Sequence, residues 1–149
     1  MLIHNFVLSF VDLDDLWSYI KSASSSPLYS SHTTPENGID RNTGTHLQKV
    51  ACIHSEGTMP PYWWMVEFKE DVEVHKVHVY NRMDCCSERL INTEVIVDGP
   101  TLCGQFPDST GKEELTLECS SIVKTRTLRF ENNNQIIQFC EVFIIGRLH

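Results

Sequence analysis

The chemically richest stretch of the sequence runs from Arg82 to Arg89. It holds two arginines, an aspartate between them and two adjacent cysteines, namely Arg82, Asp84, Cys85, Cys86 and Arg89. Arginine keeps its charge and presents its N–H donors in a rigid fork. Two forks so close together, with no clear run of acidic partners, predict a site for a ligand that offers several acceptors. The adjacent cysteines leave two alternatives open, a metal site or a disulfide between neighbours.

Composition limits the classes of protein that fit. The chain has 149 residues, of which 41% are apolar, so we expect a single domain, 1–149, with a sizeable buried core. The formal net charge of -8 argues against a nucleic-acid partner, because such proteins need a basic face to neutralise phosphates. No apolar run approaches the length of a membrane span, so we expect no membrane insertion.

The cysteines bear on the cellular compartment. An even count of 6 in a chain of this size favours a disulfide framework and an oxidising environment, with free buried thiols as the alternative. The sequence has no Cys-x-x-Cys pair, which argues against zinc. Spacing alone does not choose among the pairings of Cys52, Cys85, Cys86, Cys103, Cys119 and Cys140. The first residues lack the features of a secretory signal, which fits a cytosolic protein, a mature chain or an excised domain.

The elements that must position these residues are predicted to be mainly strands. Residues 12–23 carry apolar side chains at helical spacing and predict one short helix. Residues 24–48 are rich in Ser, Thr, Pro, Asn and Gly and predict a long loop, either ordered or disordered. After Trp63, short β-branched and aromatic runs between turn sequences predict an all-β sandwich or barrel, with strands in 65–68, 72–80, 94–97, 115–117, 127–131 and 139–145.

A second set of residues joins the arginine stretch into a longer pattern. His54 precedes Arg82-Met83-Asp84, and Arg89 follows, while Trp63-Trp64, Cys85-Cys86-Ser87-Glu88 and Cys140-Glu141-Val142 flank them in order. From Asn37 to its end, the chain thereby resembles the F-type lectins, or fucolectins. The spacer between His54 and Arg82 is one residue longer than in the usual form. We place the extra residue near Pro60-Pro61-Tyr62, where an insertion should leave the pocket intact.

The resemblance implies a fold and a function. The expected fold is an eight-stranded jelly-roll β-sandwich of the discoidin or galactose-binding type, with sugar bound on loops at one end. The expected function is reversible, non-enzymatic binding of terminal L-fucose on glycans and glycoproteins, in cell recognition and innate immunity. His54, Arg82 and Arg89 would contact the sugar, His54 as a donor through one nitrogen, with Asp84 as a brace between the guanidiniums. The chemistry is sensible, because charged donors of fixed geometry suit neutral hydroxyl and ring oxygens.

Disulfide pairing also follows from the resemblance. The Cα atoms of neighbouring residues are about 3.8 Å apart, whereas disulfides usually span roughly 4.4–6.8 Å, so a bridge between Cys85 and Cys86 would be strained. The family nonetheless forms it, and its flat sulfur face lies against the sugar ring. The alternative is two free thiols. The remaining pairs implied are Cys103–Cys119 and Cys52–Cys140.

A cation site is implied as well. The segment Asn37-Gly38-Ile39-Asp40-Arg41-Asn42 resembles the calcium-binding loop of the family, with Arg41 where glycine is common. Calcium takes roughly six to eight oxygen ligands from carboxylates, amides and carbonyls. The alternative is an Asx-rich turn without metal. The role would be structural, and at the Ala51 position the family often has serine. The implied ligands are Asn37, Asp40, Asn42, Ala51, Cys140 and Glu141.

Residues 1–36 depart most from the family, and could cover an edge strand or bind a partner. The lectin interpretation implies secretion to the extracellular space. It also leaves room for a homo-oligomer, since one pocket gives modest affinity. A discoidin-like adhesion or membrane-surface module on the same fold is the leading alternative. A glycan-acting enzyme is less favoured, because glycosidases need two spaced carboxylates, and Asp84 and Glu88 are the only acids near the motif.

Overall fold

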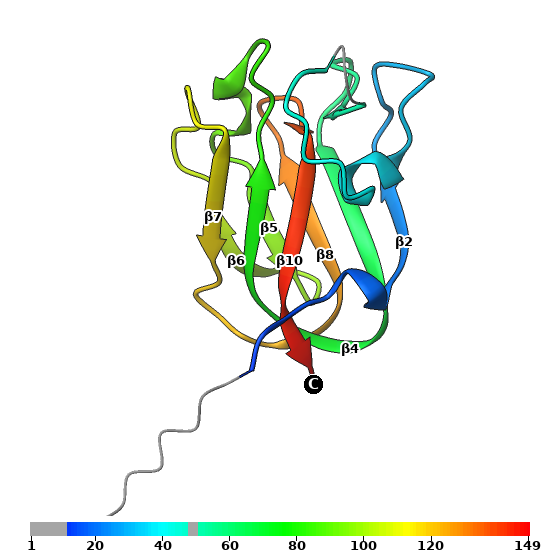
Figure 1. Ribbon diagram of the computed structural model, residues 1–149, viewed down its shortest axis with the longest axis vertical. Coiled ribbons are helices and arrows are strands. Elements are labelled where there is room, and N and C mark those ends of the chain that lie inside the picture. Colours follow the sequence, from blue (N-terminus) through cyan, green and yellow to red (C-terminus); the bar gives the residue numbers. More distant parts are fainter. Residues whose placement is uncertain (1–11, 48–50) are drawn as a thin grey trace, which may run out of the picture.

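The computed structural model describes residues 12–47 and 51–149 and has two layers of antiparallel strands (Figure 1). Three short 3-10 turns interrupt them. The predicted all-β sandwich is therefore confirmed. The elements in chain order are β1 (Asp14–Asp15), η1 (Trp17–Tyr19), β2 (Ile20–Ser25), η2 (Pro35–Ile39), β3 (Ile53–His54), β4 (Tyr62–Tyr80), η3 (Ser87–Leu90), β5 (Glu94–Val97), β6 (Thr101–Gln105), β7 (Glu114–Glu118), β8 (Lys124–Asn132), β9 (Gln138–Phe139) and β10 (Glu141–Leu148).

The long strand β4 belongs to both layers. Its first part pairs with β2 and β8, and β8 continues the layer through β5 to β6. Its second part pairs with β10 and β7, and β1 adds to the free side of β10. The pairing with β8 is irregular between Glu67 and Val72, where β4 passes from one layer to the other. The two-residue strands β3 and β9 pair separately with each other.

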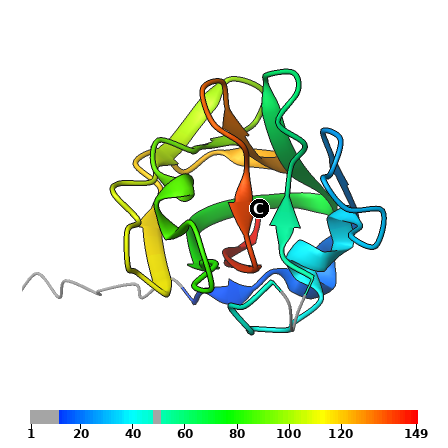
Figure 2. The same ribbon diagram turned by 90° about the horizontal axis from the view of Figure 1, so that it is seen from above.

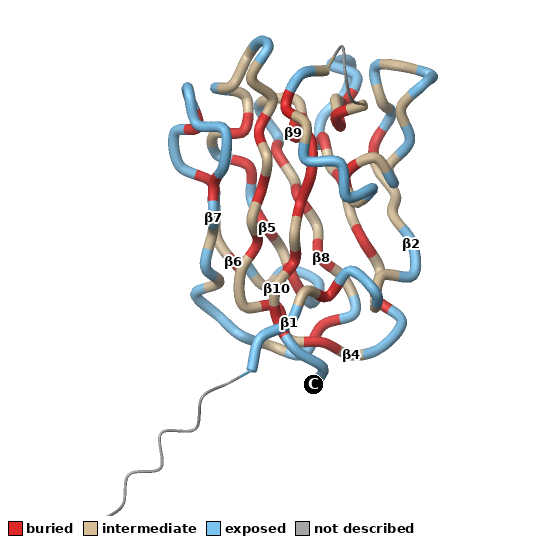
Figure 3. The backbone as a smooth tube through the Cα atoms, viewed as in Figure 1, coloured by how far each residue is buried: buried red, intermediate tan, exposed pale blue. Residues whose placement is uncertain are grey.

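The core lies between the layers, as the buried segments in Figure 3 show. In the first part of β4, alternate side chains such as Trp64, Val66 and Phe68 are buried, as expected for a strand with one face inward. The inward phase changes after Val74, close to the bulge in the β4–β10 pairing. At that bulge β4 and β10 approach closely, and a Cβ atom on Gly146 would lie 1.9 Å from the carbonyl oxygen of Glu73. Glycine is required there.

The predicted helix over residues 12–23 is wrong. This stretch forms β1, η1 and β2 instead. Leu16 is fully buried, and its N–H donates to the carbonyl of Ile144 at 2.8 Å. The open edges of β4 and β10 offer backbone partners and apolar contacts to this segment, whereas an isolated helix of about 12 residues is marginal in water. The segment therefore covers two strand edges, which was one of the roles considered for residues 1–36.

Loops from distant parts of the sequence gather at the end of the sandwich opposite the C-terminus (Figure 1). Figure 2 looks onto this end and shows the loops arranged around its centre. Of the predicted loop of residues 24–48, the structure describes 24–47. Ser24 and Ser25 end β2, and the rest contains η2. Strand β6 was not expected, and it follows β5 through a turn in which Asp98 and Gly99 have φ values of 43° and 70°. Across the described residues, no helix is long and apolar enough to cross a membrane.

Candidate functional site

The β3–β9 pair brings two polar side chains together. His54 in β3 lies directly opposite Gln138 in β9. Residues opposite each other in an antiparallel pair project from the same face. Ile53 and Phe139, their neighbours, point to the other face and are fully buried in the core. The apolar residues thus anchor the pair, and His54 and Gln138 are directed toward the loop that follows β4.

A buried asparagine shapes that loop. Asn81 is 0% exposed and its side-chain amide donates to the carbonyls of Ser87 and Lys112 at 2.8 and 3.1 Å. Its Oδ1 accepts from the backbone N–H of Arg82 at 2.9 Å. This one side chain therefore ties the start of the 82–89 loop to its far end and to the neighbouring turn. The two arginines are held on a defined backbone.

Arg82 and Asp84 form a two-pronged ion pair. Nε and Nη2 of Arg82 donate to Oδ1 and Oδ2 of Asp84 at 2.9 and 3.2 Å, and only 12% and 17% of the two side chains are exposed. Asp84 Oδ1 also accepts from the backbone N–H of Leu47 at 3.1 Å. The Arg82 guanidinium lowers the pKa of the Asp84 carboxyl, so Asp84 is ionised at neutral pH. The expected bracing role of Asp84 therefore has a geometric basis on the Arg82 side.

Arg89 joins the cluster from η3. Its Nη1 lies 3.2 Å from Nε2 of His54 and 3.2 Å from Oε1 of Gln138. The same Oε1 accepts from Nη1 of Arg82 at 3.3 Å. The structure thus brings together His54, Arg82, Asp84 and Arg89, as the sequence pattern led us to expect. It adds Gln138, whose only sequence signal is a polar residue within the apolar run Ile136 to Phe139.

The protonation of His54 follows from its neighbours. Arginine has donors only, so Nε2 of His54 must be the acceptor of the Arg89 contact, and the ring proton lies on Nδ1, which donates to the carbonyl of Ser55 at 3.1 Å. Burial lowers the pKa of His54, and the charges of Arg89 and Arg82 add to this effect. His54 is therefore neutral at pH 7. It was expected to act as a donor, but in this structure Nε2 is an acceptor.

The sequence motif also placed two cysteines in the cluster, and they are joined to each other. All three disulfides implied by the resemblance are confirmed: Cys52–Cys140, Cys85–Cys86 and Cys103–Cys119. Cys86 has a φ of 63°, in the left-handed region. Its carbonyl accepts from the N–H of Arg89 at 3.1 Å and from Nε2 of Gln138 at 3.0 Å. The Cys85–Cys86 pair is thus linked to the arginines through backbone and amide contacts.

The extra residue before Arg82 does not displace His54. Pro60 and Pro61 lie in the loop between β3 and β4, outside either strand. His54 remains within hydrogen-bonding distance of Arg89. Beside it lies Tyr29, whose ring centroid is 5.1 Å from that of His54 and which is 73% exposed. An exposed aromatic surface therefore borders the polar cluster.

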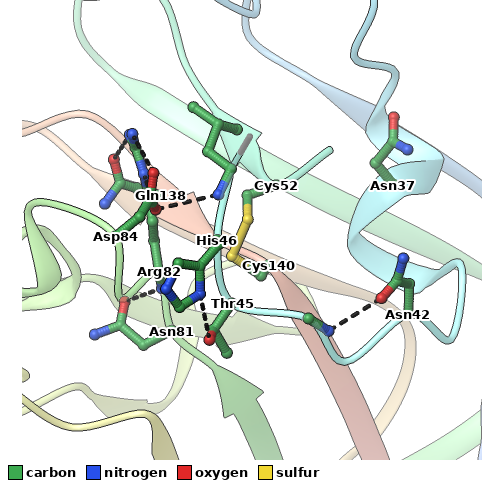
Figure 4. Close-up of a disulfide and its surroundings, with 12 residues drawn as sticks. Asn37, Asn42, Thr45, His46, Cys52, Asn81, Arg82, Asp84, Gln138 and Cys140 are labelled. Carbon is green, nitrogen blue, oxygen red and sulfur yellow. Dashed lines mark hydrogen bonds and ion pairs between the residues drawn. A yellow bond between two sulfur atoms is a disulfide. The ribbon is translucent and has the colours of Figure 1, made fainter. Parts of the chain in front are cut away.

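The candidate cation loop lies on the other side of a disulfide. In Figure 4 the Cys52–Cys140 bond lies between the group of Arg82, Asp84 and Gln138 and the loop that carries Asn37 and Asn42. The bond also brings Ala51, the neighbour of Cys52, near the start of β10. Five of the six expected ligand positions therefore lie in or just after η2, or at the disulfide. They are Asn37, Asp40, Asn42, Ala51 and Cys140. The sixth, Glu141, follows directly after Cys140 in β10.

Asp40 is the centre of the loop. Its carboxylate accepts from the N–H of Asn42 at 2.9 Å and from Nδ2 of Asn37 at 3.5 Å. Asn37 Oδ1 accepts from the N–H of Thr34 at 2.7 Å, and Asn42 Oδ1 from the N–H of Gly44 at 3.0 Å. These contacts are those of an Asx-rich turn, so they fit the structural alternative as well as a cation loop.

Glu141 is the buried acid beside this loop. It is 0% exposed, and its Oε2 has no hydrogen-bond partner among the residues that the structure describes. Burial and the nearby Asp40 carboxyl raise the pKa of Glu141 to about 9. A buried carboxylate without a countercharge is costly. Among the described residues, no three His, Cys, Asp or Glu side chains are grouped so that they alone could hold a metal ion. Two carboxylates with amide and carbonyl oxygens nevertheless form a hard-oxygen set that fits calcium.

Arg41 departs from the glycine that is common at its position, and the structure accounts for both residues. Its φ of 71° is a conformation that glycine adopts without strain. The arginine side chain forms an ion pair with Asp15 and lies over the rings of Phe143 and Trp17, at 4.4 and 5.3 Å from their centroids. These contacts fasten the N-terminal strand β1 to the loop, which offsets the backbone strain.

Comparisons with known proteins agree with the motif. The family model described as NedA-like, galactose-binding domain matches residues 37–130. The chain is 26% identical over 130 residues to a pentraxin fusion protein of Xenopus laevis, covering 81% of the chain and 31% of that protein. It is 27% identical over 119 residues to fucolectin-6 of Anguilla japonica, covering 75% of the chain and 63% of that protein. The chain therefore spans less than two thirds of either relative.

A solved structure has the same fold. The crystal structure of an F-lectin (fucolectin) from striped bass (Morone saxatilis) serum superposes with a TM-score of 0.80 at 23% identity, covering 91% of this chain and 50% of that chain. At this identity the likeness concerns the fold alone. Together with the relatives, it confirms the resemblance to fucolectins and the expected galactose-binding-like sandwich.

Proposed function

Because the chain belongs to the NedA-like, galactose-binding domain family, we propose that it is a non-enzymatic lectin that binds terminal L-fucose on glycans. The observation that carries this proposal is the convergence of two guanidiniums and a neutral histidine acceptor at one loop end, with contacts of 3.2 and 3.3 Å through Gln138 and His54. The similarity to fucolectins supports fucose as the sugar.

The polarity of the cluster favours a hydroxyl as its ligand. A hydroxyl both donates and accepts, so it would donate to Nε2 of His54 while it accepts from Arg82 or Arg89. A fully deprotonated anion such as sulfate or a phosphodiester accepts from the arginines but has no proton for Nε2. Inserting a hydroxyl between His54 and Arg89 exchanges one hydrogen bond for two. A neutral polyol is therefore the ligand class that satisfies all three side chains.

Apolar surface on either side would complete a sugar site. Tyr29 is exposed next to His54, and Cys85 is exposed in the loop that carries Arg82 and Arg89. A pyranose has polar edges and apolar C–H faces, and fucose adds a methyl group. We propose that the Cys85–Cys86 pair lies against the ring face and that Tyr29 lies near the apolar edge.

A purely binding role agrees with the acids available. Glycosidases need a pair of carboxyl groups on opposite sides of the bond to be cleaved. In the cluster, Asp84 is held by both prongs of Arg82, and among the described residues the Glu88 side chain forms no hydrogen bond or ion pair with Arg82, Asp84, Arg89 or His54. The adhesion-module alternative has no specific contact in its favour.

Calcium would complete the second site. Asp40 and Glu141 would supply carboxylate oxygens, and Asn37, Asn42, Ala51 and Cys140 would supply amide or carbonyl oxygens. The ion would remove the cost of the buried Glu141 charge and join η2 to β10. The role we propose is structural.

Three disulfides support an extracellular protein, since such bonds persist in oxidising compartments. Fucosylated glycans and glycoproteins are the proposed partners. A single shallow site gives modest affinity, so cell-surface binding would use several copies, either in one assembly or in one longer chain.

A glycan array with and without calcium tests the proposal. The expected result is binding confined to glycans with terminal L-fucose, weakened when a chelator is added. Binding to non-fucosylated glycans, or no binding at any calcium concentration, would contradict it.

A further inference from the structure

The buried amide of Gln138 joins both arginines of the candidate sugar site to the backbone of Cys86. Its Oε1 accepts from Nη1 of Arg82 at 3.3 Å and from Nη1 of Arg89 at 3.2 Å. Its Nε2 donates to the carbonyl of Cys86 at 3.0 Å. The side chain is 0% exposed. From this geometry we infer that Gln138 is a positioning residue that sets the arginine geometry for sugar binding, an inference that rests on the proposed function.

The orientation of the amide is determined by its partners. An amide oxygen has two lone pairs, and here one serves each guanidinium. A reversed amide would place its N–H groups against arginine donors and its oxygen against the Cys86 carbonyl. Both contacts would be repulsive, so one orientation remains. Gln138 therefore fixes the distance between two like charges and fixes them relative to the Cys85–Cys86 backbone.

The backbone under Gln138 is equally well fixed. The residue lies in β9 opposite His54, and Phe139 beside it is fully buried. Arg89 is thus held from two opposite residues of one strand pair, through Nη1 to His54 and to Gln138. Because Nη1 is occupied in this way, the N–H groups on Nε and Nη2 of Arg89 are left for a ligand, and among the described residues they have no acceptor.

A neutral residue at this position has a chemical advantage. Arg82 and Arg89 carry two positive charges and Asp84 one negative charge, so the cluster keeps a net positive charge with an amide at Gln138. A carboxylate there would neutralise the cluster and compete with sugar hydroxyls for the arginine donors. It would also face the Cys86 carbonyl without a proton to donate. The amide orients the donors while leaving their charge available.

The test compares Gln138→Met with Gln135→Met, a control three residues away whose side chain makes no hydrogen bond among the described residues. We expect Gln138→Met to bind L-fucose at least about tenfold more weakly, about 1.4 kcal/mol, with a melting temperature close to that of the control. NMR titration of His54, which needs no sugar, should show its pKa rising toward the ordinary value, because Arg89 is released from Nε2. The control should change neither quantity.

A second pair of variants separates positioning from packing. Gln138→Glu keeps acceptor oxygens for both arginines. Its charge competes with the sugar, so it should bind L-fucose more weakly than the parent protein, but its hold on both guanidiniums should make it bind more tightly than Gln138→Met. Gln138→Asn keeps the amide but is one methylene too short to reach both guanidiniums, so it should lose affinity, and it serves if Gln138→Met does not fold. Affinity within about twofold of the parent protein in Gln138→Met or Gln138→Asn, or equal weakening in Gln138→Met and Gln138→Glu, would overturn the inference.

The two proposals fail in different ways. If the parent protein does not bind L-fucose, the proposed function fails, whereas the His54 titration of Gln138→Met still reports on positioning. An unchanged His54 pKa in that variant would overturn the role of Gln138 even if the parent protein binds fucose.

Discussion

The arginine cluster and the candidate cation loop lie on the two sides of one disulfide, Cys52–Cys140 (Figure 4). They differ in how far other protein groups compensate their charged and polar side chains. In the cluster, like charges are offset by Asp84 and by the amide of Gln138, and His54 is neutral between Arg89 and Ser55. Beside the loop, Glu141 of β10 is buried, one of its oxygens has no hydrogen-bond partner among the described residues, and its pKa is raised to about 9.

The difference separates two uses of buried polar groups. A site whose donors are already oriented loses little freedom when a neutral ligand arrives, so its ligand contributes to recognition. A site that contains an uncompensated carboxylate gains stability when a cation arrives, so its ligand contributes to folding. We therefore expect sugar-site changes to alter affinity at nearly constant stability, and cation-site changes to alter stability first.

The largest expected effect is on fucose binding. Arg89→Ala and Arg82→Ala should each weaken binding to a fucosylated surface by at least about 100-fold, roughly 2.7 kcal/mol, because charged donors to the sugar are lost. The melting temperature should change little in Arg89→Ala and should fall in Arg82→Ala, because Asp84 then keeps a largely buried charge without its ion-pair partner. Arg126→Ala, which removes an exposed partner of Asp71, is the control. If both arginine variants still bind the fucosylated surface as the parent protein does, the sugar site has been assigned to the wrong residues.

The next effect concerns stability and calcium. Calcium at about 100 times its Kd should stabilise the fold by about 2.7 kcal/mol, which corresponds to roughly 5–10 °C in melting temperature. Glu141→Gln should lose this response. In chelator it should be at least as stable as the parent protein, because the parent must protonate the buried Glu141 carboxyl at a cost that glutamine does not have. A melting temperature that is identical with calcium and with chelator would count against the cation site.

The pH dependence of fucose binding tests the role of neutral His54 in the arginine cluster. The pKa of His54 is lowered, so His54 stays neutral above about pH 6.5 and takes a proton only as the pH falls below that value. Protonation removes the Nε2 acceptor, so affinity for L-fucose should be constant from about pH 8 to 6.5 and then fall, by up to about tenfold per unit below the His54 pKa. His54→Gln should bind more weakly and with a flat profile over this range. If the affinity of the parent protein does not fall at low pH, the neutral form of His54 is not required for binding.

The smallest expected effect is on the calcium affinity of the candidate cation loop. Ala51→Ser would add a hydroxyl oxygen beside Cys52, at the position where serine is common in F-type lectins. We expect calcium to bind a few-fold more tightly, with fucose affinity unchanged, as measured by calorimetric titration of each ligand. Unchanged calcium affinity would place residue 51 outside the coordination sphere, or limit its contribution to the backbone carbonyl.

Local pattern predicted the strands well where one face is buried. The alternation around Trp64 and from Val72 onward indicates strand before any partner is known, because burial depends on side-chain period. The helix prediction for residues 12–23 was wrong because local pattern did not decide the conformation there. The apolar residues of this segment fit a helix equally well, and the edges of β4 and β10, which lie far away in the sequence, decided its conformation.

The site was predictable in part, and mainly through resemblance. Spacing identified His54, Arg82 and Arg89 as a set, but nothing local shows that they converge. Gln138 was missed because its partners Arg82 and Arg89 lie 56 and 49 residues away, and a single glutamine in an apolar run has no distinctive pattern. The acceptor role of His54 was also beyond prediction, since it depends on the relative placement of Ser55 and Arg89.

Calorimetric titration with L-fucose and with its enantiomer D-fucose tests the central claim most directly. The two sugars have the same composition and polarity, so only a cluster with fixed donor and acceptor positions distinguishes them. The account predicts one L-fucose bound per chain and D-fucose bound at least about tenfold more weakly. Equal affinity for the two sugars, or no heat from either, would contradict a preorganised fucose site.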